Sequence, residues 1–303
     1  MDSPQQTDPT EQFEAQRPRL FSLAYRMLGS AAEAEDAVQD TYLRWHGAAP
    51  GQVAAPGAWL AKVLTNLCLN RLTSARARRE EYPGSWLPEP VPTDTGDLGP
   101  MERAEQREAV SFAVLTLMER LTPPERAAVV LRDAFDYSHR DVACVLDCTE
   151  AAARQLHRRA RLRLTEGGPR FTPTPAQNSE LLGRFLAAAA DGSLDRLEEL
   201  LAEHVVVWSD GGGRVRAALR PVTGRAKAAR FLAGLFARYA RGARLEVAEA
   251  NGVPALLVWE DGQLTSVGTV EQGEDGVTGV RIVRNPEKLA YFAARRRDLS
   301  QSG

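Results

Sequence analysis

The chain of 303 residues is poor in cysteine, carries almost no net charge and has no long apolar run. Its cysteines are only Cys68, Cys144 and Cys148, an odd and sparse set that excludes a disulfide framework. Cys144 and Cys148 have no His or Cys companion at zinc-ligand spacing. We therefore expect the thiols to fill small apolar positions in the core, and we predict neither a metal nor a cofactor.

No apolar stretch approaches the length that crosses a bilayer, so the sequence predicts no membrane partner. The first residues, MDSPQQTDPTEQFEAQRPRL, lack the basic start and the apolar stretch of a secretion signal, and we expect a cytoplasmic protein. A formal net charge of −2 excludes a surface coated in positive charge. Any nucleic-acid site must therefore come from local clustering of basic residues.

Two segments rich in proline and glycine, EYPGSWLPEPVPTDTGDLGP and EGGPRFTPTPAQN, divide the chain. Helical patterns dominate before the second segment, and alternating strand patterns follow it. We predict a multidomain fold in which two all-α domains precede an α+β domain. The predicted ranges are a helical domain at 10–80, a semi-rigid linker at 81–105, a smaller helical domain at 106–166, a linker at 167–177 and the α+β domain at 178–303.

The smaller helical domain carries a capping signal before each of three short helices. Asp147 occupies the corner before the third helix, where Asp is one of the few side chains that tolerate a left-handed backbone. Two helices joined by such a corner are typical of a helix-turn-helix unit. The capping residues are Thr122 with Pro123 and Glu125, Ser138 with Asp141, and Thr149.

The third helix has one apolar stripe and one basic face. Ala153, Leu156, Ala160 and Leu164 recur at spacings of three and four and define the buried side. Five arginines and no acid lie between positions 154 and 163, which favours phosphate binding over the alternative of an ordinary solvated face. The outward residues Arg154 and Gln155, near the helix N-terminus, are placed to reach base edges in a major groove.

The N-terminal domain offers a different chemistry. One helix ends at Gly29, and the next restarts at Ser30 with a capping box and an acidic exposed side that includes Asp36 and Asp40. An acidic face repels DNA and suits a basic protein partner, although early acids also complement the helix dipole. A further helix combines an apolar stripe with amides and arginines, a mixture that suits unpaired bases better than duplex; the alternative is a solvated helix end.

Three stretches in this order, DAVQDTYLRW, WLAKVLTNLCLNRL and YSHRDVACVL…AAARQLHRRAR, resemble regions 2 and 4 of extracytoplasmic-function sigma factors over roughly residues 10–165. The resemblance implies core RNA polymerase, through its clamp helices and flap, and promoter DNA as partners. Asp36, Gln39 and Asp40 would then bind the polymerase, and the loop from His46 to Ala58 would help to melt the minus-ten box. The implied minus-ten contacts are Lys62, Asn66, Asn70, Arg71 and Arg76, and the implied minus-thirty-five contacts are Ser138, His139, Arg140, Glu150, Arg154, Gln155, Arg158 and Arg161.

This sequence departs from the family pattern at two positions. Asp147 stands where the corner glycine is usual, and Asn70 stands where many relatives have an acid. The base preference of the minus-ten and minus-thirty-five contact regions therefore stays open.

The last 126 positions, 178–303, are not needed to read a promoter. Two amphipathic helices are followed by a strand, a Gly-rich turn with a second strand, another helix, and a meander of strands with Asn-Gly and Asp-Gly turns. This order resembles SnoaL-like cone domains. Three short pieces, WLPEP, DGGGR and NPEKL, resemble the motifs of the sigma-factor group whose fused SnoaL-like extension regulates polymerase binding and promoter activity.

The regulatory residues implied by that resemblance are Trp86, Leu87, Pro88, Asp210, Gly211, Gly212, Gly213, Arg214, Asn285, Pro286, Glu287, Lys288 and Leu289. Two local alternatives stay open, since DGGG also suits a wide turn and NPEKL also suits a helix start with Asn285 as cap. A DNA-binding regulator whose C-terminal pocket binds a small molecule or acts as a cyclase-like enzyme is the alternative function. Asp210, His204 or Trp208 would line that pocket, but they form no convincing acid–base pair, and we predict that the protein is not an enzyme.

Overall fold

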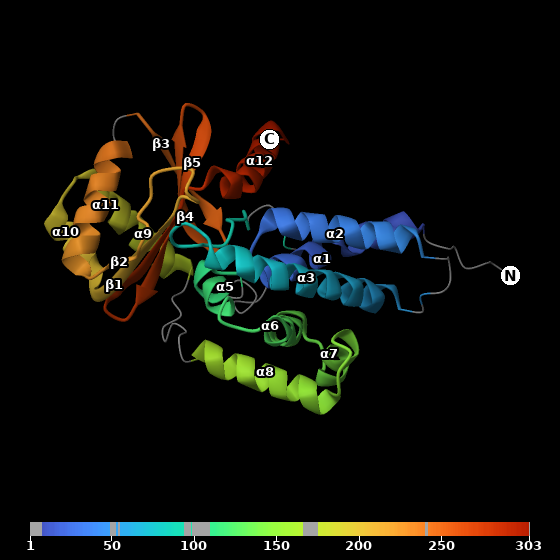
Figure 1. Ribbon diagram of the computed structural model, residues 1–303. Coiled ribbons are helices and arrows are strands. Elements are labelled where there is room, and N and C mark those ends of the chain that lie inside the picture. Colours follow the sequence, from blue (N-terminus) through green and yellow to red (C-terminus); the bar gives the residue numbers. More distant parts are fainter. Residues whose placement is uncertain are drawn as a thin grey trace. The chain divides into compact units, whose positions relative to one another are not determined.

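The computed structural model describes residues 8–48, 53, 55–93, 98, 110–165, 175–239 and 242–302. By compactness the chain forms two units, the first from Met1–Arg78, Gly96–Ala109 and Leu117–Gly167, and the second from Arg79–Thr95, Val110–Thr116 and Gly168–Gly303. The first unit is helical and the second is built on a sheet, so the predicted fold class is confirmed (Figure 1).

The N-terminal part of the first unit contains three helices, which are α1 (Pro9–Leu28), α2 (Ala31–His46) and α3 (Pro56–Glu80). Gly29 closes α1 with a left-handed backbone at φ 68°, and the Ser30 hydroxyl caps α2 by accepting from the Glu33 N–H at 3.1 Å, as predicted. The apolar stripe of α3 is buried at Leu60 and Leu64. Tyr25, Met27 and Leu28 of α1 are also fully buried.

The rest of the first unit supplies the predicted helix-turn-helix. Its elements are α6 (Pro123–Val129), a π-helical turn (Val130–Ala134), α7 (His139–Val145) and α8 (Glu150–Thr165), preceded by α5 (Phe112–Met118), whose first residues belong to the second unit. Both predicted capping boxes are present, and Thr149 caps α8 through the Ala152 N–H at 3.2 Å. Asp147 takes the left-handed conformation expected at the corner, with φ 49°.

A six-stranded sheet organises the second unit, in the order β2-β1-β6-β5-β4-β3. Strands β3 to β6 form the predicted antiparallel meander, and β1 joins β6 in parallel. The strands are β1 (Leu201–Asp210), β2 (Val222–Thr223), β3 (Arg244–Ala250), β4 (Val253–Glu260), β5 (Gln263–Gly273) and β6 (Gly276–Val283), and the helices are α9 (Pro175–Ala190), α10 (Leu194–Leu200), α11 (Arg225–Tyr239) and α12 (Pro286–Ser302).

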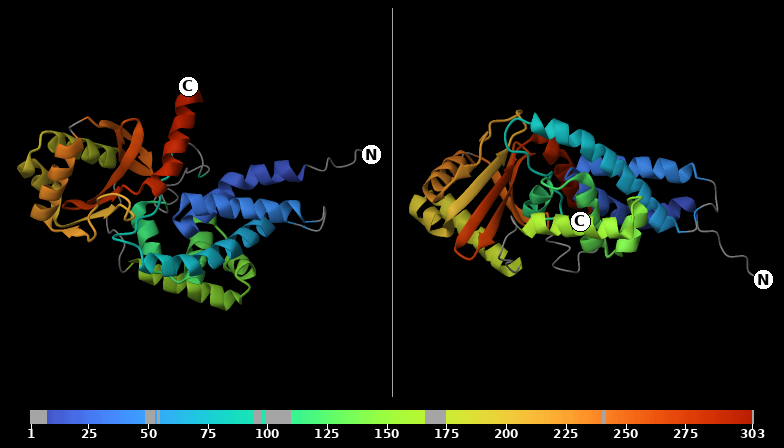
Figure 2. Two further views of the ribbon diagram at one scale, coloured as in Figure 1. Left: turned by 45° about the horizontal axis from the view of Figure 1, so that its top comes forward. Right: turned by 60° about the horizontal axis from the view of Figure 1, so that its bottom comes forward.

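Strand alternation gives the sheet two cores. Leu256 and Val258 face a core formed with α9, α10 and α11, whereas Leu257 and Trp259 face the opposite core, to which α12 contributes Leu289 and Phe292. Figure 2 shows α12 apart from the other helices of this unit. Leu87 and Phe112 also belong to this second core, although both precede the sheet by about a hundred positions. The α12 face of the sheet is therefore completed by Leu87, from the segment expected to be a linker, and by Phe112, from the range predicted for the smaller helical domain.

Three expectations are wrong in detail. Residues 87–92 are buried within the second unit. This part of the segment that begins at Glu81 is therefore not the exposed linker that was expected. The strand expected after the Gly-rich turn is absent from 214–219, because the turn redirects the chain and pairing resumes only at Val222. Cys68 is buried as expected, but Cys144 is exposed because the buried face of α7 comprises Val142, Ala143 and Val145.

Candidate functional site

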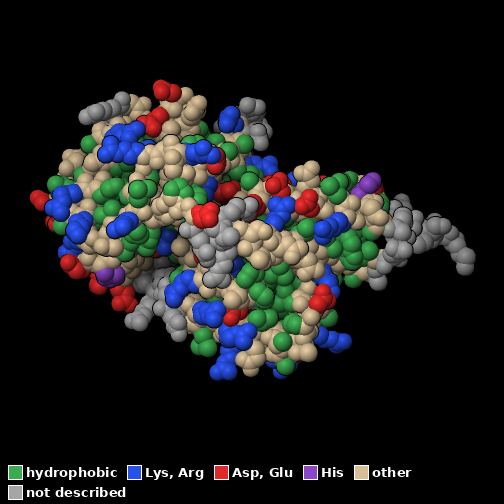
Figure 3. All heavy atoms as spheres, in the orientation of Figure 1, with side chains coloured by type: hydrophobic (Ala, Val, Ile, Leu, Met, Phe, Trp, Pro, Cys, Tyr) green, Lys and Arg blue, Asp and Glu red, His purple; other side chains and the backbone are tan. Residues whose placement is uncertain are grey.

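Helix α8 presents an arginine-rich face to solvent. Ala153 and Ala160 are fully buried, with Leu156 and Leu164 half-buried beside them, so the predicted stripe is confirmed. Lys and Arg side chains gather along this helix in Figure 3. The side chains that were predicted to face outward are all exposed, namely Glu150, Arg154, Gln155, Arg158 and Arg161.

The arginines of α8 divide into two kinds. Arg159 and Arg163 bind Glu125, a carboxylate whose side chain is only 3% exposed. Burial raises the pKa of Glu125, but hydrogen bonds from Thr122 and the two guanidinium groups outweigh it and lower the pKa below its ordinary value. These two arginines therefore hold the capping box of α6. Arg154 instead pairs with Glu150 on the exposed surface, where phosphate or bases have access.

The first turn of α7 completes the surface predicted for the upstream box. Ser138 accepts from the Asp141 N–H at 3.1 Å as the helix cap. The Ser138 hydroxyl and N–H donate to the Asp141 carboxylate at 2.6 and 3.1 Å, and these two bonds lower the pKa of Asp141. His139 is half-buried beside His157, with ring centroids 5.5 Å apart, and Arg140 is exposed. Burial and the neighbouring His157 lower the pKa of His139. A neutral imidazole at neutral pH is therefore favoured.

The acidic and basic residues of the N-terminal domain form one cluster. The Arg71 guanidinium lies 2.7 Å from the Asp40 carboxylate and 3.8 Å from that of Asp36. Asp36 and Gln39 are exposed, and Asp40 is partly exposed. Arg71, predicted to contact the minus-ten box, thus neutralises part of the acidic surface predicted to bind polymerase. The spacing of these residues in the sequence did not predict this contact.

The other minus-ten candidates lie along α3. Asn70 is exposed and Asn66 is half-buried. Lys62 forms an ion pair with Asp147 at 2.5 Å, which joins the minus-ten candidate face to the corner of the helix-turn-helix. The Arg76 side chain and residues 49–52 and 54 of the predicted melting loop lie outside the described residues.

Arg126 makes a second connection inside the first unit, and sequence reasoning missed it. Its guanidinium, 2% exposed, donates from Nε and Nη2 to the Arg26 carbonyl at 3.2 and 3.1 Å. Burial lowers its pKa to about 9. Helix α6 is thereby fastened to the carboxyl end of α1. A cation in the first turn of a short capped helix was the only sequence signal.

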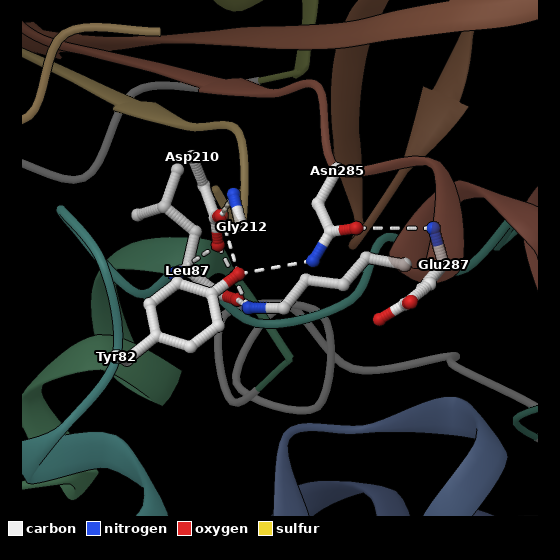
Figure 4. Close-up of polar contacts among 7 residues, drawn as sticks. Tyr82, Leu87, Asp210, Gly212, Asn285 and Glu287 are labelled. Carbon is white, nitrogen blue, oxygen red and sulfur yellow. Dashed lines mark hydrogen bonds and ion pairs between the residues drawn. The ribbon is translucent and has the colours of Figure 1, made fainter. Parts of the chain in front are cut away.

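All three regulatory motifs meet at Asp210, the last residue of β1. Its carboxylate is fully buried and accepts from the Tyr82 hydroxyl at 2.6 Å, the Leu87 N–H at 2.8 Å and the Gly212 N–H at 3.0 Å (Figure 4). The Lys288 ammonium lies 2.7 Å from the same carboxylate. These four contacts use the acceptor capacity of the carboxylate, so Asp210 is a structural anion.

Lys288 binds the linker segment as well as Asp210. Its ammonium donates to the Leu87 carbonyl at 2.5 Å and lies 4.7 and 4.3 Å from the ring centroids of Tyr82 and Trp86. Burial lowers the pKa of Lys288 to about 8, although Asp210 opposes the shift. The ion pair therefore holds the chain from Tyr82 to Leu87 against the sheet domain, and we name these residues with Asp210, Asn285 and Lys288 the linker latch.

The glycines of DGGGR permit this close packing. Gly212 has φ 59°, and a Cβ there would fall on the Asn285 amide; Gly213 has φ 70°, and a Cβ there would lie 2.9 Å from the Pro83 ring. Asn285 uses its two side-chain atoms separately, since Nδ2 donates to the Tyr82 hydroxyl at 3.0 Å and Oδ1 accepts from the Glu287 N–H. Both local alternatives for the motifs, turn and helix cap, are thus present together with the contact between motifs.

The remaining motif residues surround the latch. Leu87, Pro88 and Leu289 are buried, and Pro286 begins α12. Arg214 and Glu287 form an exposed ion pair at 2.9 Å, which ties the Gly-rich turn to the start of α12. Gly211 is buried at the start of the turn, where its carbonyl accepts from the Arg214 N–H at 2.9 Å. Tyr82 was missed because it precedes the WLPEP motif; an aromatic beside Pro83 was its only signal.

A small apolar cavity of about 30 Å³ lies in the other core of the second unit, between the sheet and helices α9 and α11. Ser266 and Tyr239, joined by a hydrogen bond of 2.9 Å, are among its few polar neighbours. Asp210, His204 and Trp208 do not line it, because Asp210 is in the linker latch and His204 is exposed. The expectation that Asp210, His204 or Trp208 would line a pocket is wrong for this cavity.

Neither a metal cluster nor a membrane span is found in the part of the chain that the structure describes. No group of three or more His, Cys, Asp and Glu side chains is arranged to hold an ion there. None of the described helices is both long and apolar enough to cross a bilayer.

Comparison with known proteins agrees with the two helical regions. The model of Sigma-70 region 2 matches residues 12–78, and that of Sigma-70, region 4 matches residues 111–164. The chain is 44% identical over 234 residues to the ECF RNA polymerase sigma factor SigJ of Mycobacterium tuberculosis, covering 76% of this chain and 74% of SigJ. It is 30% identical over 276 residues to SigG from the same organism, covering 81% of this chain and 72% of SigG.

The similarity extends to the sheet domain. The crystal structure of Mycobacterium tuberculosis SigJ superposes with a TM-score of 0.74 at 35% sequence identity, covering 93% of this chain and 98% of that one. The helical regions define a transcription initiation factor of the sigma-70 class. This chain belongs to the ECF RNA polymerase sigma factors, and the sigma factors are initiation factors without catalytic activity of their own.

Proposed function

We propose that this sigma factor reads a minus-ten box with the α3 face and a minus-thirty-five box with α7 and α8, while α2 binds core polymerase in the cytoplasm. The exposed arginines of α8 and the acidic side of α2 support this division, because they attract partners of opposite charge. We further propose that the C-terminal domain regulates initiation by holding the linker segment. The linker latch carries that proposal, because it joins all three regulatory motifs around one buried ion pair.

The contacts inside the first unit support a restraining role. Lys62 and Asp147 are paired at 2.5 Å, whereas the two boxes are centred about 25 base pairs, roughly 85 Å, apart along B-DNA. The two readers must therefore separate before both boxes are bound. A linker held on the C-terminal domain opposes that separation, so release of the latch should increase initiation.

An enzymatic or ligand-binding C-terminal domain is the weaker candidate. Asp210, the acid that would act as general base, already accepts four hydrogen bonds or ion-pair contacts from the protein. The apolar cavity of about 30 Å³ has room for only a few water molecules, which is small for a ligand pocket. We therefore assign the domain a regulatory role without turnover.

Run-off transcription with bacterial core polymerase and a library of promoter fragments tests the proposal. We expect the full chain to initiate from a subset of fragments, and Asp210→Asn to raise the output at limiting sigma factor by about fivefold, a typical coupling between sites. Asp261→Asn is the matched control, because Asp261 is exposed in a turn and is not one of the latch residues. Folded proteins that never initiate would overturn the promoter-reading proposal, and equal output from Asp210→Asn and Asp261→Asn would overturn the restraining role of the latch.

A further inference from the structure

A single side chain outside the three motifs binds both Val91 and Val110. Asn251, fully buried in the β3–β4 turn, accepts from the Val91 N–H at 3.1 Å through Oδ1 and donates to the Val110 carbonyl at 2.8 Å through Nδ2. The Asn251 N–H also donates to the Val91 carbonyl at 3.0 Å. Val91 and Val110 are thus held by the two ends of one side-chain amide.

Further contacts bind Pro92 and Thr93 to the same turn between β3 and β4. The Thr93 hydroxyl donates to Glu249 at 2.6 Å and accepts from the Gly252 N–H at 3.0 Å, and Pro92 forms a bridge with Ala250. Because Asn251 has φ 54°, few residues other than Gly, Asn and Asp fit the backbone there, and of these only Asn offers both an acceptor and a donor. Asn251 therefore both forms the turn with Gly252 and binds Val91 and Val110; we call this set of contacts the clamp.

We propose that Asn251 clamps Val91 to Val110, and that this clamp must open before both promoter boxes are read. Fully extended, residues 81–110 would reach about 100 Å, enough to span the boxes. With Val91 and Val110 bound to one side chain, the distance between these two residues adds almost nothing to that reach. Asn251 is thus a positioning residue that sets how far the two readers separate, an inference that rests on the proposed promoter function.

The test compares Asn251→Gly with Asp261→Gly in the full chain. Both positions lie in hairpin turns with closely similar backbone, at φ 54° and 50°, and each is followed by a glycine at φ 75°. Glycine fits both, so the two substitutions differ mainly in the loss of the linker contacts. Asn251→Asp is a second variant of the same size, which keeps the acceptor for Val91 and removes the donor to Val110.

The first measurement is hydrogen exchange of peptides containing Val91. We expect exchange of the Val91 amide to accelerate about tenfold in Asn251→Gly, because its acceptor is lost, and to stay unchanged in Asp261→Gly. The second is run-off transcription at limiting sigma factor from a library promoter and from the same promoter with its upstream box scrambled. We expect Asn251→Gly and Asn251→Asp to raise output about fivefold on the intact promoter only.

The outcomes separate the two levels of the proposal. Unchanged exchange at Val91 in Asn251→Gly, or intact-promoter output equal to that of Asp261→Gly, would overturn the clamp. A rise of the same size on the scrambled promoter would also overturn it, because reach between boxes is then irrelevant. If the unaltered protein initiates from no fragment, the promoter function itself fails; if it initiates but the clamp variants behave like their control, only the clamp fails.

Discussion

At the scale of single residues, the latch shows how a short motif acquires several duties. Asp210, Lys288 and Asn285 each contact the chain near Tyr82 while they also complete a turn or a helix start. The local duties followed from sequence, since Asn-Pro and Gly-Gly patterns have known turn and cap chemistry. The pairing of Asp210 with Lys288 did not, because the two positions are 78 residues apart and nothing local requires their contact.

The buried ammonium of Lys288 makes the stability of the second unit depend on pH. Its pKa is about 8 in the folded protein against 10.5 for the ordinary side chain, so between these values the unfolded chain binds more protons than the folded one. Stability must therefore rise with pH across that window. One such group contributes about 1 kcal/mol per pH unit.

We expect urea unfolding, followed by tryptophan fluorescence from pH 8 to pH 10, to show this rise in the unaltered protein. The double variant Asp210→Asn with Lys288→Met removes both charges and should have a smaller slope. Arg281, whose pKa burial lowers to about 9, is present in both proteins, so the difference isolates Lys288. The raised pKa of Tyr82 acts in the opposite direction only at higher pH. Equal slopes would show that Lys288 does not titrate in this window.

At the scale of elements, the helix-turn-helix was predictable almost to the residue. Capping boxes at Thr122 and Ser138, and the left-handed Asp147, follow from local rules that the sequence states directly. The division of labour among the arginines of α8 was not predictable. Arg159 and Arg163 bind Glu125 of another helix, and only the packing of α8 against α6 decides which arginines are left at the surface.

Arg154→Ala should weaken recognition of the upstream box by about 1–3 kcal/mol, because Arg154 is exposed near the start of the reading helix. Its side chain is 63% exposed and, among the described residues, pairs with Glu150 on the helix surface, so we expect no loss of folding stability. Arg196→Ala is the control, since Arg196 is 65% exposed and pairs with Asp191 on the second unit. Competition binding between intact and scrambled upstream boxes measures the effect; an Arg154→Ala protein with full discrimination would exclude a base contact.

At the scale of the whole chain, a net charge of −2 conceals strong segregation. Five arginines lie on α8, while α2 carries Glu33, Glu35, Asp36 and Asp40. Periodicity and composition predicted this arrangement, together with the order of domains. They could not predict that residues 87–92 are buried with the sheet domain, because a proline-rich stretch has the same local preferences as a free linker and as a buried strap.

The segregated charge predicts that polymerase binding and DNA reading respond to different substitutions. Asp36→Arg with Asp40→Arg should lower the affinity for core polymerase at least tenfold, because a reversed charge faces a basic partner. Asp40→Asn controls for the lost pair with Arg71 at 2.7 Å and should have a much smaller effect. Glu11→Arg makes the same kind of change on the exposed first turn of α1 and should leave affinity unaltered. Titration of labelled sigma factor with core polymerase at two salt concentrations measures this; equal affinities for the double variant and Glu11→Arg would place the polymerase contact elsewhere.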